Sequence, residues 1–559
     1  MNTGVPRNTP GARDAFVLAL AILSLVVSCL MVSAGKEFWN DELYSWYLLA
    51  DPSFSGMWAA FNDKLNNTPG LYFVTGWIWA RLFGASELSL RLFSSLGICA
   101  AMAVVWLTLR RVYSFWPTCI GTLTVFLTST IVLSQNAEAR MYGLFLLMCA
   151  VAVYQFVYLD TRGQYGFGDL IRVALVHAAI VNTHLFGPFY SGAILAAFVV
   201  ADLLNGRFRK GIYLAVMAGW LGFLLYLPAF LVQSDAGRPR SWLPIPLLGD
   251  FLGLVGLASP SFVHVVFVSA LMLCLTLIYV LRSAAPGEAG RHEAVNGAER
   301  SLLVMALALI LPTAATWLLS RVSRPIFWDR YLVPSIIGYC IVIAHATSLY
   351  LGSRRAPARA TSDPGVSVGD GRRLIGHVVL SGFVAVLLLN PLWYAVNVEP
   401  RAPAGRDDRQ FGYEELPAVV EAPGGFLERW HYRPDRERYY FILDEAAAMR
   451  QESGLFGPQS YKHMDAYRRN YERLHANILS SEDFLARFDR FIVIDYLDFD
   501  AACPSRVFGL QNARDWHDIH CPQWVETRLL SNPDYVVTRL GTTATWQSVL
   551  LVERTAAGQ

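Results

Sequence analysis

The chain is poor in charged residues. Of its 559 residues only 16% are Asp, Glu, Lys or Arg, whereas 54% are hydrophobic. Ordinary soluble domains carry about 25% charged residues, so this composition excludes a typical soluble protein and predicts a polytopic membrane protein. The formal net charge is only +2, and nothing in the sequence supports nucleic-acid binding.

The sequence also lacks a recognisable metal motif and an internal repeat. No His-x-x-x-His spacing and no Cys-rich cluster points to zinc. The isolated His177, His264, His345 and His377 are expected to be structural. No repeat of solenoid period occurs, which excludes that class of architecture.

Long apolar runs fill most of the first 395 residues. About 20 apolar residues are needed to cross a hydrocarbon core of about 30 Å, and by this length we expect about eleven transmembrane helices. The expected spans are Ala15–Ala34, Leu90–Leu109, Trp116–Ser134, Met141–Leu159, Leu170–Thr183, Phe186–Leu203, Ile212–Val232, Phe262–Leu281, Leu302–Leu319, Tyr331–Leu351 and Leu374–Tyr394. An odd number of spans places the two ends of the chain on opposite sides of the membrane.

Basic residues orient these spans. Lys and Arg are enriched in cytoplasmic loops, and alternate loops hold clusters such as Arg110–Arg111, Arg207–Lys210 and Arg354–Arg359. The alternation requires a turn at residues 184–188. We therefore predict a multi-pass protein of the inner (plasma) membrane with a cytoplasmic N-terminus. The run Leu71–Phe83, only 13 residues long, suits an interfacial helix on the outer face better than a span.

Two adjacent carboxylates, Asp41 and Glu42, follow the first apolar run. Ionised groups are costly near lipid, so acids beside a span usually face water, a partner or a substrate. The predicted topology puts further polar residues on the same outer side. These are Asn67, Arg91, Glu138, Arg140, His184 and Arg330. A carboxylate can accept a hydroxyl proton and an arginine can hold phosphate oxygens, so the set suits transfer from a phosphate-bearing donor.

These residues lie in six short motifs along the chain. The motifs are Trp39-Asn40-Asp41-Glu42, Asn67-Thr68-Pro69-Gly70-Leu71-Tyr72, Glu87-Leu88-Ser89-Leu90-Arg91-Leu92, Glu138-Ala139-Arg140-Met141-Tyr142, Asn182-Thr183-His184 and Asp329-Arg330-Tyr331-Leu332-Val333-Pro334. In this order they resemble motifs of the GT-C glycosyltransferases that use polyprenyl-phosphate sugars, in particular the protein O-mannosyltransferase and aminoarabinose-transferase branch. The resemblance covers roughly residues 15–395, and the second motif departs at two positions from the family's His-Pro-Pro-Leu-Tyr.

The resemblance implies an inverting glycosyltransferase that moves a sugar from a polyprenyl-phosphate carrier to a lipid, glycan or protein acceptor at the outer membrane face. Asp41 would act as general base, with Glu42 and Glu138 as further catalytic candidates. The remaining expected roles fall into two groups. The donor phosphate would contact Arg140, His184, Arg330 and Tyr331, and other parts of the substrates would contact Asn67, Tyr72, Arg91 and Tyr142.

Structural alternatives stay open for these residues. Asp41 could cap a helix, and Glu42 and Glu138 could pair with Arg140 or Arg330. Arg330 could anchor its span at the interface. We predict no required cofactor or metal, although Mg²⁺ or Mn²⁺ between Asp41, Glu138 and the donor phosphate is an alternative, because hard oxygen ligands suit these ions.

The chain changes character after the last apolar run. Residues 1–395 are expected to form a GT-C-like catalytic domain with an external loop at 35–89, and residues 396–559 a soluble α/β domain outside the cell membrane. Its expected strands include Tyr439–Leu443, Phe491–Ile494, Tyr535–Thr538 and Ser548–Val552. Cys503 and Cys521 could form a disulfide in an oxidising compartment, with two free thiols as the alternative.

A transporter or flippase of a lipid-linked or anionic substrate is the competing function, since charges within membranes also mark transport pathways. A transporter would place such charges at the midplane of the bilayer. Here most of the selected charges fall at the outer ends of spans. The sequence therefore favours an enzyme: a polytopic α-helical membrane protein, GT-C-like, with a C-terminal soluble α/β domain.

Overall fold

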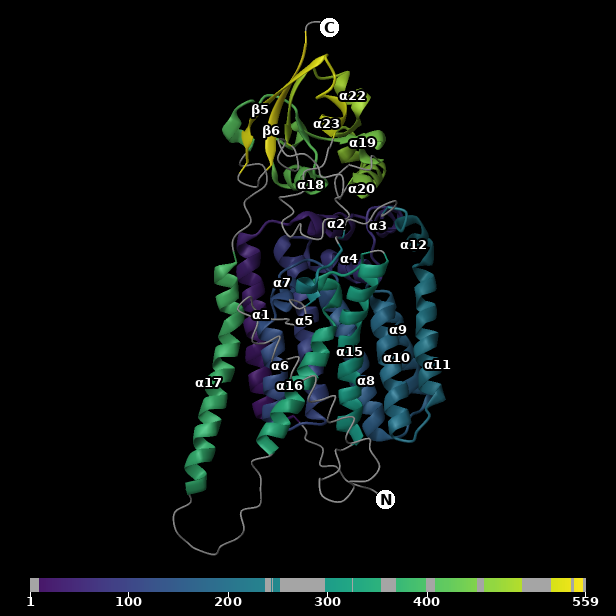
Figure 1. Cartoon of the computed structure of the whole chain (residues 1–559), viewed down its shortest axis with the longest axis vertical. Coiled ribbons are helices and arrows are strands. Elements are labelled where there is room, and N and C mark those ends of the chain that lie inside the picture. Colours follow the sequence, from purple (N-terminus) through teal and green to yellow (C-terminus); the bar gives the residue numbers. More distant parts are fainter. Residues whose placement is uncertain are drawn as a thin grey trace, which may run out of the picture.

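Helices built from the apolar runs form a bundle, and an α/β domain lies beyond one end of it (Figure 1). The computed structural model describes residues 10–236, 243, 245–251, 297–323, 325–352, 368–398, 408–449, 457–494, 524–543 and 547–555. The upper end of the bundle in Figure 1 is the end that faces the α/β domain, and the opposite end is called the lower end.

Six helices in the described part of the chain are long and apolar enough to cross a membrane. They are α1 (Ala12–Gly35), α5 (Glu87–Arg110), α8 (Tyr142–Arg162), α10 (Gly187–Leu204), α15 (Gly297–Val322) and, in its second part, α17 (Val368–Asn397). Helices α9 (Phe167–Val181) and α16 (Ser335–Gly352) accompany them in the bundle. All expected spans are helical except Phe262–Leu281, which lies outside the described residues.

Two of the expected spans are bent. Helices α6 (Phe115–Thr128) and α7 (Thr130–Asn136) meet at 65°, and the run from α11 (Lys210–Trp220) through η1 (Leu221–Leu225) meets α12 (Leu227–Gln233) at 56°. If each bent pair counts as one span, the described residues hold up to eight candidate spans.

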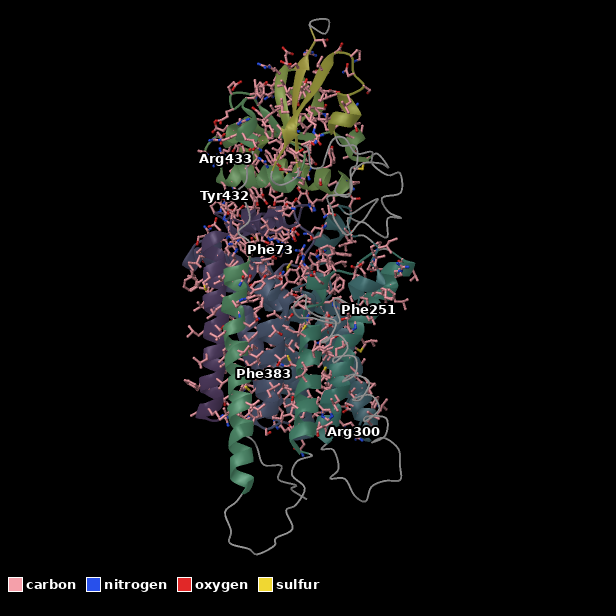
Figure 2. All side chains as sticks on the ribbon, turned by 60° about the vertical axis from the view of Figure 1, so that its left-hand side comes forward. Phe73, Phe251, Arg300, Phe383, Tyr432 and Arg433 are labelled. Carbon is pink, nitrogen blue, oxygen red and sulfur yellow. The ribbon has the colours of Figure 1, made fainter. Side chains whose placement is uncertain are left out.

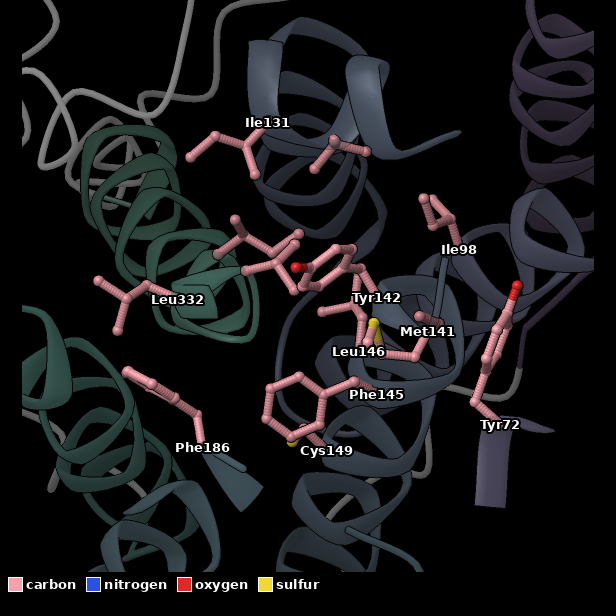
Figure 3. Packing of buried hydrophobic residues seen from close by; sticks show 14 of the residues in the cluster. Tyr72, Ile98, Ile131, Met141, Tyr142, Phe145, Leu146, Cys149, Phe186 and Leu332 are labelled. Atoms are coloured by element: carbon pink, nitrogen blue, oxygen red, sulfur yellow. The ribbon is translucent and has the colours of Figure 1, made fainter. Parts of the chain in front are cut away.

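Glycines let α5 and α8 pack with their backbones in contact. A Cβ atom on Gly143 would stand 2.1 Å from the carbonyl oxygen of Ser94, and one on Gly97 would stand 2.6 Å from the backbone of Gly143. Small residues allow such close approach in helical membrane proteins. Farther along α8, Phe145 and Leu146 continue the buried core, and Figure 3 shows them together with residues of the neighbouring helices.

Short helices cover the upper end of the bundle. They are α2 (Asn40–Leu49), α3 (Phe54–Phe61), α4 (Leu71–Phe83) and the 3-10 turn η2 (Asp329–Leu332). Helix α4 has the bounds of the predicted interfacial helix. The predicted turn at residues 184–188 is also confirmed, because α9 ends at Val181 and α10 begins at Gly187.

The C-terminal domain contains a six-stranded sheet with the order β3-β2-β1-β4-β6-β5. The neighbours among β3, β2, β1 and β4 pair in parallel. Strand β6 pairs antiparallel with β4 on one side and with β5 on the other. The strands are β1 (Ala418–Val420), β2 (Tyr439–Leu443), β3 (Ile478–Ser480), β4 (Arg490–Ile494), β5 (Tyr535–Thr542) and β6 (Ser548–Arg554). The four named strands of the predicted α/β domain are confirmed, whereas Cys503 and Cys521 lie outside the described residues.

Two helices of this domain, α18 (Pro423–Tyr432) and α20 (Gly457–Asn470), face the upper end of the bundle (Figure 1). The other described helices of the domain are α19 (Glu445–Met449), α21 (Glu472–His475), α22 (Ser481–Leu485) and α23 (Trp524–Arg528), with the 3-10 turns η3 (Asp408–Phe411) and η4 (Arg436–Arg438). Helix α18 packs on α2 so closely that a Cβ on Gly424 would lie 2.8 Å from the Asn40 side chain. Tyr432 and Arg433, at the end of α18, mark this junction in Figure 2.

Candidate active site

The first turn of α2 carries the acidic pair. Glu42 is the third residue of the helix, and its Oε2 accepts a hydrogen bond of 3.3 Å from the backbone N–H of Trp39. An acid at this position accepts a hydrogen bond from a backbone N–H that has no partner within the helix. Its negative charge is also stabilised by the positive end of the helix dipole. The local sequence therefore explains why α2 begins where it does and why both acids stand at its start.

Glu42 is held in a buried ion pair with Arg91 of α5. Arg91 donates from Nε to Oε1 at 2.8 Å and from Nη2 to Oε2 at 2.7 Å, and both side chains are completely buried. The backbone N–H of Ala139 donates a further bond of 2.8 Å to Oε1. Glu42 thus does form an ion pair, but with Arg91 instead of Arg140 or Arg330. This setting speaks for a structural role of both residues, against the expected catalysis by Glu42 and substrate contact by Arg91.

Asp41 has a different environment. Its Oδ2 accepts a hydrogen bond of 2.7 Å from Arg330 Nη2 and lies 4.0 Å from Arg140 Nη2. Its Oδ1 accepts no hydrogen bond from any described residue, and 19% of the side chain is exposed. Arg140 also donates to the backbone oxygen of Asp41 at 2.8 Å. Asp41 therefore presents one oxygen to its surroundings while two arginines balance its charge.

The two arginines still have donors to offer. Within the described part of the chain, the Nε atoms of Arg140 and Arg330 and the hydroxyl of Tyr142 are buried without hydrogen-bond partners. Buried donors that lack partners are costly, so a cluster of them points to a polar ligand. The Arg330 guanidinium also lies 5.2 Å from the ring centre of Trp39. This ring fixes the arginine beside Asp41.

The hydroxyl of Ser94 on α5 holds the backbone of Arg140. It donates to the Arg140 carbonyl at 2.8 Å and accepts from the Arg140 N–H at 3.1 Å. The close packing of α5 on α8 is what brings Ser94 to this loop. The position of Arg140 is therefore fixed from its main chain and from its guanidinium.

Glu138 lies beside this group but forms no ion pair within 4.0 Å in the described structure. Its Oε2 accepts a hydrogen bond of 3.2 Å from Gln135 Nε2, and the residue is only 8% exposed. Burial raises the pKa of Glu138 to about 7, and the negative charge of Glu42 adds to this effect, whereas Arg330 opposes it. Glu138 therefore titrates near neutral pH. The alternative of a direct pair with Arg140 or Arg330 is not observed.

His184 fills the turn between α9 and α10. Its Nδ1 accepts a hydrogen bond of 3.1 Å from the backbone N–H of Phe186, and its ring centre lies 5.2 Å from that of Tyr331 and 5.6 Å from that of Tyr142. Burial lowers the pKa of His184 to about 3, and Arg140 and Arg330 lower it further. The ring is therefore neutral, with its proton on Nε2.

Tyr72 and Asn67 complete the set expected from the sequence. Tyr72 of α4 is buried against Phe93 with a ring distance of 5.9 Å, and its hydroxyl has no partner among the described residues. Asn67, with its amide nitrogen turned toward the nearby acceptors, donates to the backbone oxygens of Gln233 at 2.9 Å and Asn66 at 3.1 Å. Asn67 therefore belongs to a corner between the external loop and the end of α12, and no contact joins it to Asp41.

Some residues near Asp41 were not predicted. His463 and Tyr467 of α20 pack on the upper side of α2, where His463 lies 5.6 Å from the Tyr44 ring and Tyr467 lies 5.0 Å from the Tyr47 ring. No motif marks residues 457–470 in the sequence. The one sequence signal for this contact is the high content of aromatic residues in α2, which indicates that another part of the chain packs on its outer side.

No group of three or more His, Cys, Asp or Glu residues that could hold a metal ion occurs in the ranges that the structure describes. The positive charge beside Asp41 comes from Arg140 and Arg330.

The fold and the site define a helical membrane protein with an acid-and-arginine site between its bundle and a C-terminal α/β domain. No protein-family model and no curated protein matches the chain. Among solved structures, ArnT from Cupriavidus metallidurans bound to undecaprenyl phosphate aligns with 98% of this chain and 98% of its own, at 12% identity and a TM-score of 0.48. The apo state of ArnT from the same organism aligns with 97% of this chain and 98% of its own, at 12% identity and a TM-score of 0.41.

Proposed function

We propose that the protein is a membrane glycosyltransferase of GT-C type that transfers a sugar from a polyprenyl phosphate to an acceptor hydroxyl at the outer face of the membrane. One observation carries the proposal. Asp41 Oδ1 accepts no hydrogen bond from the described residues, while Oδ2 lies 2.7 Å from Arg330 and 4.0 Å from Arg140. A base and a pair of phosphate-binding groups therefore stand side by side.

In the proposed reaction, the acceptor hydroxyl gives its proton to Asp41 and attacks the anomeric carbon of the sugar. A new bond from the acceptor oxygen to this carbon forms as the bond from the carbon to the phosphate oxygen breaks. The polyprenyl phosphate leaves with the electron pair of that bond, so a single displacement inverts the anomeric configuration. General-base assistance of this kind typically contributes about 10²- to 10⁴-fold to the rate.

Arg140 and Arg330 would stabilise the charge that grows on the departing phosphate. Their buried Nε atoms have no other described partner, and a positioned donor of this kind is typically worth about 3 to 4 kcal/mol in the transition state. Tyr142 and the Nε2–H of His184 would add neutral donors, and Tyr331 would pack against His184. Because the arginines supply positive charge, we propose no requirement for Mg²⁺ or Mn²⁺.

The test is transfer by purified protein from a panel of polyprenyl-phosphate sugars to lipid, glycan and peptide acceptors. Asp41→Asn should lower turnover by at least about 10²-fold. Asp51→Asn is the matched control, because it makes the same change just beyond the other end of α2, and it should keep full activity. Equal turnover of wild type and Asp41→Asn would remove Asp41 as the base. Movement of a labelled polyprenyl phosphate across vesicles without any transfer would favour a flippase instead.

A further inference from the structure

The segment 36–39, between α1 and α2, is neither helix nor strand, and its last residue, Trp39, accepts a hydrogen bond of 2.9 Å from the Leu43 N–H at the start of α2. The segment is held from two sides. On the bundle side, Arg91 donates from Nη1 to the Lys36 carbonyl at 2.6 Å and from Nη2 to the Glu37 carbonyl at 2.9 Å. The same guanidinium pairs with Glu42, so one buried side chain ties both the segment and the first turn of α2.

On the opposite side, the segment is held by Tyr432 of the C-terminal domain. The Tyr432 hydroxyl accepts a hydrogen bond of 2.6 Å from the backbone N–H of Phe38 and donates one of 2.6 Å to Glu87 Oε1 at the start of α5. A phenol has one proton to donate and can accept another bond, so both contacts form at once. Tyr432 therefore joins three elements at one atom.

The ring of Phe38 connects the two sides. It is 1% exposed and its centre lies 5.2 Å from the Arg91 guanidinium. His431, the neighbour of Tyr432, packs with its ring centre 6.3 Å from that of Phe38 and 4.4 Å from that of Trp46 on α2. The end of α18 thus contacts both the segment and the helix that carries Asp41.

We propose that Tyr432 is a positioning residue for the transfer reaction: its hydroxyl and Arg91 clamp the segment 36–39 and thereby set the place of Asp41 relative to Arg140 and Arg330. This inference rests on the proposed function of Asp41. It gives the C-terminal domain a direct part in the chemistry. Misplacement of a reacting group by about 1 Å can lower a rate by about 10²-fold, even when the mutated residue is far from the reaction.

Tyr432→Phe removes the hydroxyl and leaves the ring in place. Tyr471→Phe is the matched control, because Tyr471 also belongs to the C-terminal domain and donates a hydrogen bond of 3.0 Å to the Tyr47 carbonyl, near the other end of α2. Both variants keep the ring and weaken the contact between the domains: Tyr432→Phe removes two hydrogen bonds and Tyr471→Phe removes one. Only Tyr432→Phe should lower kcat, by about ten- to a hundredfold, with KM for the polyprenyl-phosphate donor changed by no more than about twofold.

A second measurement does not need turnover. Hydrogen–deuterium exchange of the peptide that contains Phe38 should be faster in Tyr432→Phe than in wild type or Tyr471→Phe, by about tenfold, because the Phe38 N–H has lost its acceptor. Unchanged exchange at Phe38 would overturn the clamp. Faster exchange with kcat equal to that of Tyr471→Phe would overturn its role in positioning Asp41. If wild-type protein transfers no sugar, the proposed function fails, and exchange alone decides whether the clamp exists.

Discussion

Asp41 and Glu42 are chemically similar neighbours that the fold places in opposite settings. Glu42 points into the bundle, where Arg91 and the Ala139 N–H saturate it, whereas one oxygen of Asp41, beside Arg140, has no hydrogen-bond partner in the part of the chain that the structure describes. A saturated buried carboxylate holds structure because its lone pairs are already used. The neighbouring carboxylate can accept a proton because one of its oxygens is not used. The division of roles follows from the direction in which each side chain leaves the first turn of α2.

Glu138 gives a prediction at the residue scale. Its pKa in the folded protein is raised to about 7 by burial, against about 4.3 for an unperturbed Glu. The folded state therefore binds the proton more tightly than the unfolded state does. The contribution of Glu138 to stability should be largest below about pH 4.5 and should be lost as the pH rises to about 7, with a slope of at most about 1.4 kcal/mol per pH unit.

Thermal unfolding in detergent between pH 5 and 7.5 checks this sign. The Tm of wild type should fall relative to that of Glu138→Gln as the pH rises, since Gln cannot ionise. Glu415→Gln, at an exposed position of the C-terminal domain, makes the same change in charge and should follow wild type. A constant Tm difference between Glu138→Gln and wild type over this range would show that the carboxyl group titrates normally.

At the scale of elements, the contact of α5 with α8 positions Arg140, and Gly143 makes the contact possible. Gly143→Ala would place a methyl group 2.1 Å from the Ser94 carbonyl oxygen, so the helices would have to move apart. Overpacking of this kind costs about 1 to 3 kcal/mol. The movement should also disturb the Ser94 hydroxyl that holds the Arg140 backbone. We expect a lower Tm and a lower transfer rate.

Gly192→Ala on α10 is the control for this prediction. A Cβ atom at Gly192 would meet nothing within 4 Å, and Ala is favoured over Gly inside a helix by about 1 kcal/mol. Its Tm should equal or exceed that of wild type. If Gly143→Ala behaved in the same way, the close contact between α5 and α8 would not constrain the site.

The bounds of an element were predicted best where helix-breaking residues stand at both ends of an apolar run. The bounds of α4 were predicted because Pro69 and Gly70 precede it and Gly84, with φ of 84°, ends it. The bend between α6 and α7 was not predicted. It occurs at a single residue with extended backbone, Ser129, and the hydropathy of an apolar run does not depend on backbone conformation. The three-residue strands β1 and β3 were too short to give a periodic signal.

The site could be predicted only as a list of residues. The contact of Asp41 with Arg330 joins residues 289 positions apart, and the side of a helix on which each one lies depends on packing. The pairing of Glu42 with Arg91 and the approach of Tyr432 depend in the same way on how α5 and α18 meet α2. Motif order indicated which residues share one end of the bundle, but it could not distinguish buried from accessible acids.

At the scale of the whole molecule, the site and the C-terminal domain share one end of the bundle, and the basic clusters among the described residues, at the end of α5 and between α10 and α11, lie at the other. Helix α17 runs from the lower to the upper end before the α/β domain begins (Figure 1). Arg300, at the start of α15, marks the lower end in Figure 2. Lys and Arg accumulate on the cytoplasmic side of membrane proteins. The predicted orientation therefore places Asp41 and the C-terminal domain outside the cytoplasm.

Labelling of single cysteines in intact cells tests this orientation. With Cys274, Cys503 and Cys521, the three cysteines outside the described residues, replaced by Ser, the background should not react with an impermeant thiol reagent, because the five remaining cysteines are buried. Glu482→Cys, on the exposed surface of the C-terminal domain, should then react. Phe208→Cys, in the basic loop after α10 and 62% exposed, should react only after the membrane is permeabilised. Reaction of Phe208→Cys but not Glu482→Cys in intact cells would reverse the orientation and place the site in the cytoplasm. A donor displayed on the outer leaflet could then no longer reach it.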